Sequence, residues 1–286
     1  FKAVPAHKLG VVAAKATLAR AEVEAGELGD VIVGHCMMRS DEINIARVIS
    51  LKADIPIHVP AFTVQRQCAS GMQAVVSGCQ QIWMGEHEVV LAGGVENMSR
   101  VPYVLKDYRF GGRMWNGEVT DALTEGLTDP IGHFHMGMTA ENLATEFSIT
   151  REEQDELACT SQTRAVAAID EGKFTDEIVP IEVPTKRGKP PVVCDTDEHP
   201  RRGATVEGLG KLRPAFKKDG GTVTAGNASG INDGAAFMVV ASEEYVQRTG
   251  AKPLAWILDH QVAAVEPERM GFGPVPAVKQ LLERRK

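Results

Sequence analysis

The sequence predicts an α/β fold in which helices cover both faces of a mainly parallel sheet. Segments with strand character alternate with segments whose apolar residues recur at helical spacing, the order typical of parallel strands in one sheet. Residues 89–91 form an unbroken apolar run, as a strand buried on both faces requires. The alternation stops near residue 95 and returns after residue 233, which indicates a segment inserted within this domain.

The first part of the chain supplies most of the expected sheet. Its helices are indicated by apolar residues at helical spacing, and its strands by short apolar runs between turn residues. The expected elements are, in order, a helix over residues 9–25, a strand over 30–35, a helix over 42–53, a strand over 61–64, a helix ending near residue 84 and a strand over 88–92.

The inserted segment is richer in charge, glycine and proline. Helices are expected over residues 139–147 and 151–172, and the second should open with a capping box, in which Thr150 and Glu153 each bond the other's main chain. The α/β pattern then resumes. Its expected elements are a strand over 235–241, a helix over 242–248, a strand over 253–258 and a helix over 276–285.

Composition restricts the class of protein. The chain has 286 residues, enough for two domains, with an ordinary 43% hydrophobic and 24% charged residues. The net charge of −7 argues against a nucleic-acid partner, which needs a basic surface. No apolar run approaches the roughly 18 residues of a membrane span, so no membrane span is expected.

The cysteines indicate a reducing environment. They are odd in number, scattered and without Cys-x-x-Cys spacing, which argues against a disulfide framework and against a metal site. We therefore expect a cytoplasmic protein, or one in a reducing organelle matrix. The five are Cys36, Cys68, Cys79, Cys159 and Cys194.

One cysteine stands at the junction of a strand and a helix, within residues 65–76. A thiol at the first turn of a helix faces unpaired backbone N–H groups and the positive end of the helix dipole, which favour the nucleophilic thiolate. The small residues after Cys68 leave room for another molecule. Covalent acyl transfer needs these parts. The alternative is a buried structural cysteine, the commoner state of a free thiol.

Five later segments accompany this junction in a fixed order. They are residues 88–99 (EVVLAGGVENMS), 135–142 (HMGMTAEN), 211–216 (KLRPAF), 224–235 (TAGNASGINDGA) and 270–277 (MGFGPVPA). Together with residues 65–76, they resemble the thiolases, the enzymes that cleave or form 3-ketoacyl-CoA. The resemblance runs from about His7 to the last residue.

The resemblance implies a thiolase-like layered fold built from two similar α/β halves. Residues 1–95 and 233–252 would form the first half, and residues 96–232 a loop domain that carries much of the CoA site. Residues 253–286 would only begin the second half, which is largely absent. The family's Asn-Glu-Ala-Phe, Gly-His-Pro and Cys-Gly-Gly-Gly loops do not occur in this sequence.

The resemblance also implies an activity. The chain would be an acyltransferase of fatty acid metabolism and β-oxidation, catalysing thiolysis of 3-ketoacyl-CoA or the reverse Claisen condensation through a Cys68 acyl-enzyme. Acyl-CoA and CoA would be substrates and no cofactor is implied. The family's assembly implies a homodimer or homotetramer.

Six further residues are implied as contacts of CoA and substrate: His135, Met136, Arg201, Phe216, Ala225 and Ser229. In the family the His-Met pair lines the pantetheine tunnel, and the serine bonds the pantetheine amide. The arginine segment lies at the adenine and phosphate end. Structural alternatives are a polar surface histidine, a tight turn around Ser229 and a charged surface loop around Arg201.

Two other functions remain open from the sequence. The chain could be a catalytically incomplete thiolase fragment that binds CoA or a partner chain. Since the family's base lies in an absent loop, we then expect no thiolysis, and poor solubility or association because a sheet edge is uncovered. A ketoacyl-synthase-like condensing enzyme is the other alternative, although that nucleophile loop reads Ala-Cys-Ser-Ser, unlike residues 67–71.

Overall fold

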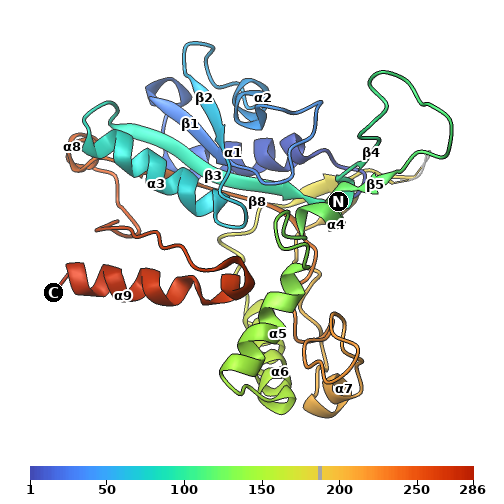
Figure 1. Ribbon diagram of the computed structural model, residues 1–286. Coiled ribbons are helices and arrows are strands. Elements are labelled where there is room, and N and C mark those ends of the chain that lie inside the picture. The colour runs from blue at the N-terminus through green and yellow to red at the C-terminus, as the bar shows by residue number, and fades with distance from the viewer. Residues whose placement is uncertain (186–188) are drawn as a thin grey trace. The chain divides into compact units, whose positions relative to one another are not determined.

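A computed structural model of the chain describes residues 1–185 and 189–286 (Figure 1). They form two compact units. The first unit comprises residues 1–102, 179–195 and 232–258, and the second comprises residues 103–178, 196–231 and 259–286. Compact units need not coincide with the halves of a duplicated fold, so the domain limits expected from the sequence stay a prediction.

The first unit is built on a four-stranded sheet with the order β2-β1-β3-β8. Strands β2 (Ala61–Val64), β1 (Asp30–Gly34) and β3 (Val89–Asn97) are parallel, whereas β8 (Asp233–Ala241) runs antiparallel to β3. The register pairs Asn97 with Asp233, so β8 begins beside the end of β3 and returns along it. The predicted mainly parallel α/β fold is confirmed, with one antiparallel edge strand.

Helices cover both faces of this sheet, as the sequence predicts (Figure 1). Helices α1 (Ala6–Ala21) and α2 (Ile45–Lys52) share a core with Val31 and Val33 of β1. The intervening Ile32 packs instead with Ala74 of α3 (Ser70–Trp83). Successive side chains of a strand point to opposite faces. The unbroken apolar character of β1 and β3 is therefore explained by burial on both sides.

The first unit contains four further short elements and one more helix. They are the 3₁₀ turns η1 (Ala25–Glu27) and η2 (Met98–Arg100), the paired strands β6 (Ile181–Val183) and β7 (Val192–Cys194), and α8 (Glu243–Thr249).

The regular elements of the second unit are mostly helices. Its elements are β4 (Tyr103–Val104), β5 (Thr120–Asp121), α4 (Ala122–Gly126), α5 (Met136–Glu146), α6 (Arg151–Asp170), α7 (Val206–Gly210), the 3₁₀ turn η3 (Pro267–Phe272) and α9 (Pro274–Arg284). The predicted capping box of α6 is confirmed, because Thr150 and Glu153 bond each other's main chain at 2.8 and 3.2 Å. The backbone N–H and the hydroxyl of Thr150 both donate to the Glu153 carboxylate and lower its pKa.

One predicted element is wrong: residues 253–258 do not form a strand. A strand needs a partner to satisfy its backbone groups, and no strand pairs with this segment within residues 1–185 and 189–286. Its apolar side chains accordingly lie in solvent, with Leu254 fully exposed. Among the residues placed by the structure, no helix has the length and apolar character needed to cross a membrane.

Three glycines let the start of α3 lie directly against the sheet. A Cβ on Gly34, the last residue of β1, would be 2.3 Å from the carbonyl carbon of Ser70. A Cβ on Gly94 of β3 would be 3.2 Å from the Cα of Gly71. Both contacts are with backbone, which has no side-chain rotamer to yield. The first turn of α3 therefore packs against β1 and β3 at a distance that only glycine allows.

Replacing Gly34 by alanine should test this packing. The added methyl would push the first turn of α3 away from β1, and we expect it to lower the free energy of unfolding by about 2 kcal/mol or more, as overpacked cores do. Gly26→Ala is the matched control, because its Cβ would lie 3.9 Å from Pro56, an ordinary contact. Urea unfolding should separate the two variants, and equal midpoints would contradict the packing argument.

Candidate active site

Cys68 lies in a tight turn between β2 and α3, and its side chain is exposed. The turn is closed by two backbone hydrogen bonds, from Ala69 N–H to Arg66 C=O and from Ser70 N–H to Gln67 C=O, both 3.0 Å long. The exposure excludes the alternative of a buried structural cysteine. A thiol at the start of a long helix, reachable from solvent, has the placement that nucleophilic cysteines use.

The residue before Cys68 has a backbone conformation that L-amino acids rarely adopt. Gln67 has φ of +47°, in the left-handed region. The hydroxyl of Ser70, which is buried, accepts from Arg66 N–H at 2.8 Å and donates to Gln67 C=O at 2.6 Å. Nothing in the sequence pattern indicates these contacts, since a serine after the thiol could equally have capped the helix.

The segment that follows β1 lies against the same turn. The Cys36 thiol donates to the side-chain oxygen of Gln67 at 3.2 Å. The Glu96 carboxylate, at the end of β3, accepts from Cys36 N–H at 2.9 Å and from Met37 N–H at 3.3 Å. Burial, the Glu96 charge and Cys68 together raise the pKa of the Cys36 thiol to about 11. Cys36 therefore remains a protonated thiol near neutral pH.

The remaining cysteines do not resemble nucleophiles. Cys79 is buried in α3, and burial raises the pKa of its thiol. The half-buried Cys159 thiol donates to Ala204 C=O at 3.4 Å. Cys194, at the end of β7, is half-buried.

The six predicted CoA contacts all belong to the second unit. His135 precedes α5, which begins at Met136, and its Nδ1 accepts from Gly137 N–H at 3.0 Å. In the neutral ring Nε2 then carries the proton. The ring stacks on Phe216, with centroids 4.8 Å apart and planes 19° from parallel. His135 and Phe216, which are far apart in the sequence, are thus packed face to face.

Ala225 and Ser229 lie exposed on a loop that is held by hydrogen bonds to side chains of α5 and α6. The buried Glu141 carboxylate of α5 accepts from Thr222 N–H at 2.9 Å and from Val223 N–H at 2.8 Å. Further along the loop, Asn227 accepts from Thr224 N–H at 2.7 Å and donates to the buried Asp155 of α6 at 3.0 Å. Glu141 and Asn227 stand within the motifs of residues 135–142 and 224–235, but their residue types alone indicate no role for either.

Arg201 is exposed, and its backbone N–H donates to the Gln162 side chain on α6 at 2.8 Å. The neighbouring Arg202 pairs with Asp170 at 2.6 Å and holds the pKa of that carboxyl below its ordinary value. Within the described part of the chain, no hydrogen bond or ring contact joins Arg201 to the His135–Phe216 stack.

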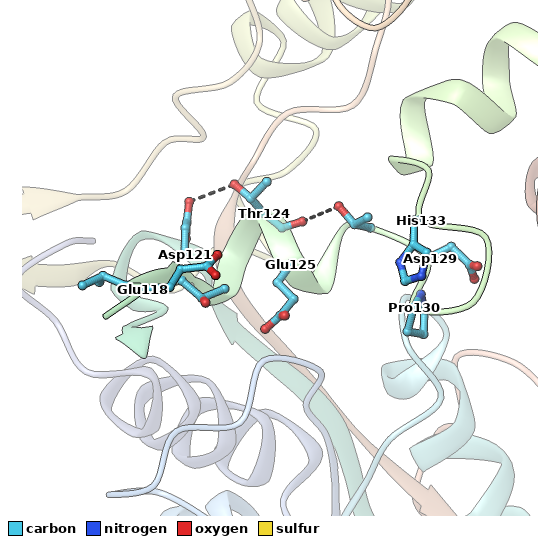
Figure 2. A pocket seen from close by; sticks show the side chains of 10 residues that line it. Glu118, Asp121, Thr124, Glu125, Asp129, Pro130 and His133 are labelled. Carbon is cyan, nitrogen blue, oxygen red and sulfur yellow. Dashed lines mark hydrogen bonds between the residues drawn. The ribbon is translucent and has the colours of Figure 1, made fainter. Parts of the chain in front are cut away.

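A pocket in the second unit lies over residues 118–133 and contains none of the predicted site residues (Figure 2). Figure 2 shows Glu118, Asp121, Glu125 and Asp129 around it, and the bond between Thr124 and Asp121 measures 2.8 Å. These carboxylates disfavour a phosphate by like-charge repulsion. Among residues 1–185 and 189–286, no group of His, Cys, Asp and Glu side chains is placed to hold a metal ion.

The fold and the exposed thiol define the chain as an α/β protein with a solvent-reachable cysteine where a strand meets a helix. It belongs to the thiolase family, since the thiolase N-terminal domain matches residues 1–244. An acetyl-CoA acetyltransferase of Pseudomonas aeruginosa is 45% identical over 282 residues, covering 98% of this chain and 71% of that protein.

Solved thiolase structures agree with this assignment. The acetyl-CoA acetyltransferase of Bacillus anthracis superposes with a TM-score of 0.94 at 50% identity, covering 98% of this chain and 70% of that one. Human mitochondrial 3-ketoacyl-CoA thiolase in complex with CoA gives a TM-score of 0.90 at 44% identity, covering 97% and 69%. The predicted family and the predicted layered fold are therefore confirmed.

Alkylation should distinguish the thiols. We expect brief treatment with iodoacetamide at pH 8 to modify Cys68 first, because it is exposed whereas Cys79 is buried. Cys36 should react slowly until the pH approaches its pKa of about 11, since the thiolate is the reactive form. Peptide mapping across pH measures both, and modification of Cys36 or Cys159 before Cys68 would contradict the assignment.

Replacing Glu141 by glutamine should loosen the loop that carries Ala225 and Ser229. The amide presents one acceptor and two donors where the carboxylate accepts from two N–H groups, so we expect about 1–3 kcal/mol less protection of these amides. Hydrogen exchange at Thr222 and Val223 measures it. Glu146→Gln in the same helix, whose carboxylate pairs with Arg269, should leave these amides unchanged, and equal exchange in both variants would refute the anchoring role.

Proposed function

We propose that this thiolase-family chain acts as an acyltransferase between 3-ketoacyl-CoA and CoA, with Cys68 as the residue that accepts the acyl group. The observation that carries the proposal is the exposed Cys68 thiol held just before α3. The fold supports it, because the first turn of α3 lies against the end of β1 and the middle of β3. A thiol held there has a fixed scaffold behind it and solvent in front.

In the first stage, the Cys68 sulfur attacks the 3-keto carbon of the substrate. The carbonyl π electrons move to oxygen and form a tetrahedral oxyanion, for which the backbone N–H of Cys68 is proposed as one donor. Collapse of this intermediate breaks the bond between C2 and C3. The electron pair passes to C2, and acetyl-CoA leaves as an enolate that takes up a proton. The shortened acyl group remains on Cys68 as a thioester.

In the second stage, the thiol of free CoA attacks the acyl-enzyme. The new thioester forms on CoA, the bond to Cys68 breaks, and the proton of CoA's thiol balances the one taken up by acetyl-CoA. The same steps in reverse join two acyl units in a Claisen condensation. This covalent path predicts ping-pong kinetics.

The second unit is proposed to hold the CoA portion. The stack of His135 on Phe216 offers an apolar surface for the pantetheine arm, and Nε2 of His135 offers a hydrogen-bond donor there. Met136 would extend that surface. Ala225 and Ser229 lie on the loop anchored by Glu141, where the Ser229 hydroxyl could bond an amide. Arg201, being exposed and cationic, is proposed for the phosphate end.

Assembly and location are proposed on narrower grounds. Strand β2 is an edge of its sheet and bears an exposed Phe62, which suits pairing with a second copy as a homodimer or part of a homotetramer. Five free cysteines suit a reducing compartment such as the cytoplasm.

Formation of an acyl-enzyme tests the proposal without requiring full turnover. Incubation with acetyl-CoA or acetoacetyl-CoA should attach one acetyl group, which peptide mapping should place on Cys68. We expect Cys68→Ala to abolish the modification and Cys36→Ala to retain it, because Cys36 remains protonated. Acetyl found on another side chain, or on none at saturating thioester, would rule out the assigned nucleophile.

A further inference from the structure

The turn before Cys68 holds Gln67 in a conformation that it would not adopt without support. Left-handed backbone is uncommon for residues with a Cβ, and glutamine has no side-chain feature that favours it. Such conformations persist where the surrounding structure enforces them, and they gather at functional sites. The φ of +47° at Gln67 therefore requires contacts that keep it there.

Ser70 makes two of these contacts through one hydroxyl. The hydroxyl accepts from Arg66 N–H at 2.8 Å and donates to Gln67 C=O at 2.6 Å, so it bonds the main chain on both sides of the residue with positive φ. Cys36 adds a contact to the Gln67 side chain at 3.2 Å. Ser70 is itself buried, and Gly34 contacts its backbone, so it is a fixed point relative to the sheet.

An ordinary helix cap would look different. A capping serine bonds N–H groups two or three residues ahead of it, inside the helix. The N-cap position of α3 is Ala69, which has no side chain able to cap, and the Ser70 hydroxyl bonds backward to Arg66 and Gln67. The hydroxyl thus stabilises the turn that carries the thiol and not the helix that follows.

We propose that Ser70 is a positioning residue for Cys68: its hydroxyl holds Gln67 in the left-handed region and thereby sets where the adjacent thiol lies relative to the start of α3. The inference rests on the proposed role of Cys68 as nucleophile. Without the hydroxyl, Gln67 relaxes toward ordinary backbone, and the Cys68 thiol, one residue on, moves from its exposed place before α3.

The rate of Cys68 alkylation by iodoacetamide at fixed pH tests the proposal. Ser70→Ala should slow it about fivefold, the equivalent of about 1 kcal/mol. Ser70→Thr restores the hydroxyl and should recover the rate to within about twofold. Ser77→Ala is the matched control on the same helix, since it removes a half-buried hydroxyl distant from the turn. In this variant iodoacetamide should alkylate Cys68 at the same rate as in the unmodified chain.

The experiments distinguish failure of the Ser70 proposal from failure of the proposed acyl-transfer function. A Ser70→Ala variant that alkylates Cys68 at the unmodified rate overturns the proposal. Protection of the buried Cys79 shows in the same maps that each variant is folded. Alkylation involves no acyl transfer. If the Ser70 variants showed the expected alkylation rates but Cys68 was not acetylated by acetyl-CoA, only the proposed function would be overturned.

A Gln67→Asn variant tests whether the Ser70 hydroxyl acts on Cys68 through the conformation of Gln67. Asparagine enters the left-handed region more readily than glutamine, so in a Gln67→Asn background the loss caused by Ser70→Ala should shrink to within about twofold. An undiminished loss there would show that the hydroxyl does not act through Gln67. If Ser70→Ala alone exposed Cys79, the double variant would supply the decisive rate, and slow alkylation in its folded form would overturn the proposal.

Discussion

The close approach of two backbones, that of α3 and that of β1, is the constraint on which the candidate site depends. Gly34 faces the Ser70 backbone at a distance that leaves no space for a Cβ, and Gly94, on the neighbouring strand β3, faces Gly71. Side chains can adjust to one another, but backbone in contact with backbone cannot. These contacts therefore fix the distance between the sheet and the turn that carries Cys68, independently of the hydrogen bonds within the turn.

Much of the first unit could be predicted from sequence because its signals are local and repeated. The apolar run of residues 89–91 indicated burial on both faces, and both faces are covered. In the second unit, the capping box at Thr150 could be predicted because it depends on two residues three positions apart. The strand expected over residues 253–258 failed because strand formation depends on a distant partner, which local composition does not report.

The site was predictable only where residue identity was enough. Cys68 stands out as a thiol at a strand–helix junction, and its exposure agrees with that interpretation. The conformation of Gln67 could not be foreseen, since a single left-handed residue without glycine leaves no pattern. The anchoring role of Glu141 could not be predicted either. A glutamate on a helix is ordinarily solvated, and its burial here results from a loop some eighty residues later in the chain.

The antiparallel strand β8 gives this molecule a particular order of assembly. The sheet of the first unit is completed by a strand that follows residues 103–178 and 196–231 of the second unit in sequence. The bond from Ser99 N–H to Asp233 spans 134 residues. During synthesis, the open edge of β3 must wait until residues 233–241 have left the ribosome, while residues 103–178 can already begin to fold. Closing so long a loop costs little more than closing a shorter one, about 0.6 kcal/mol per doubling, but non-local pairing is slow. The nascent chain thus carries its thiol turn on an unfinished sheet while the residues between β3 and β8 are synthesised.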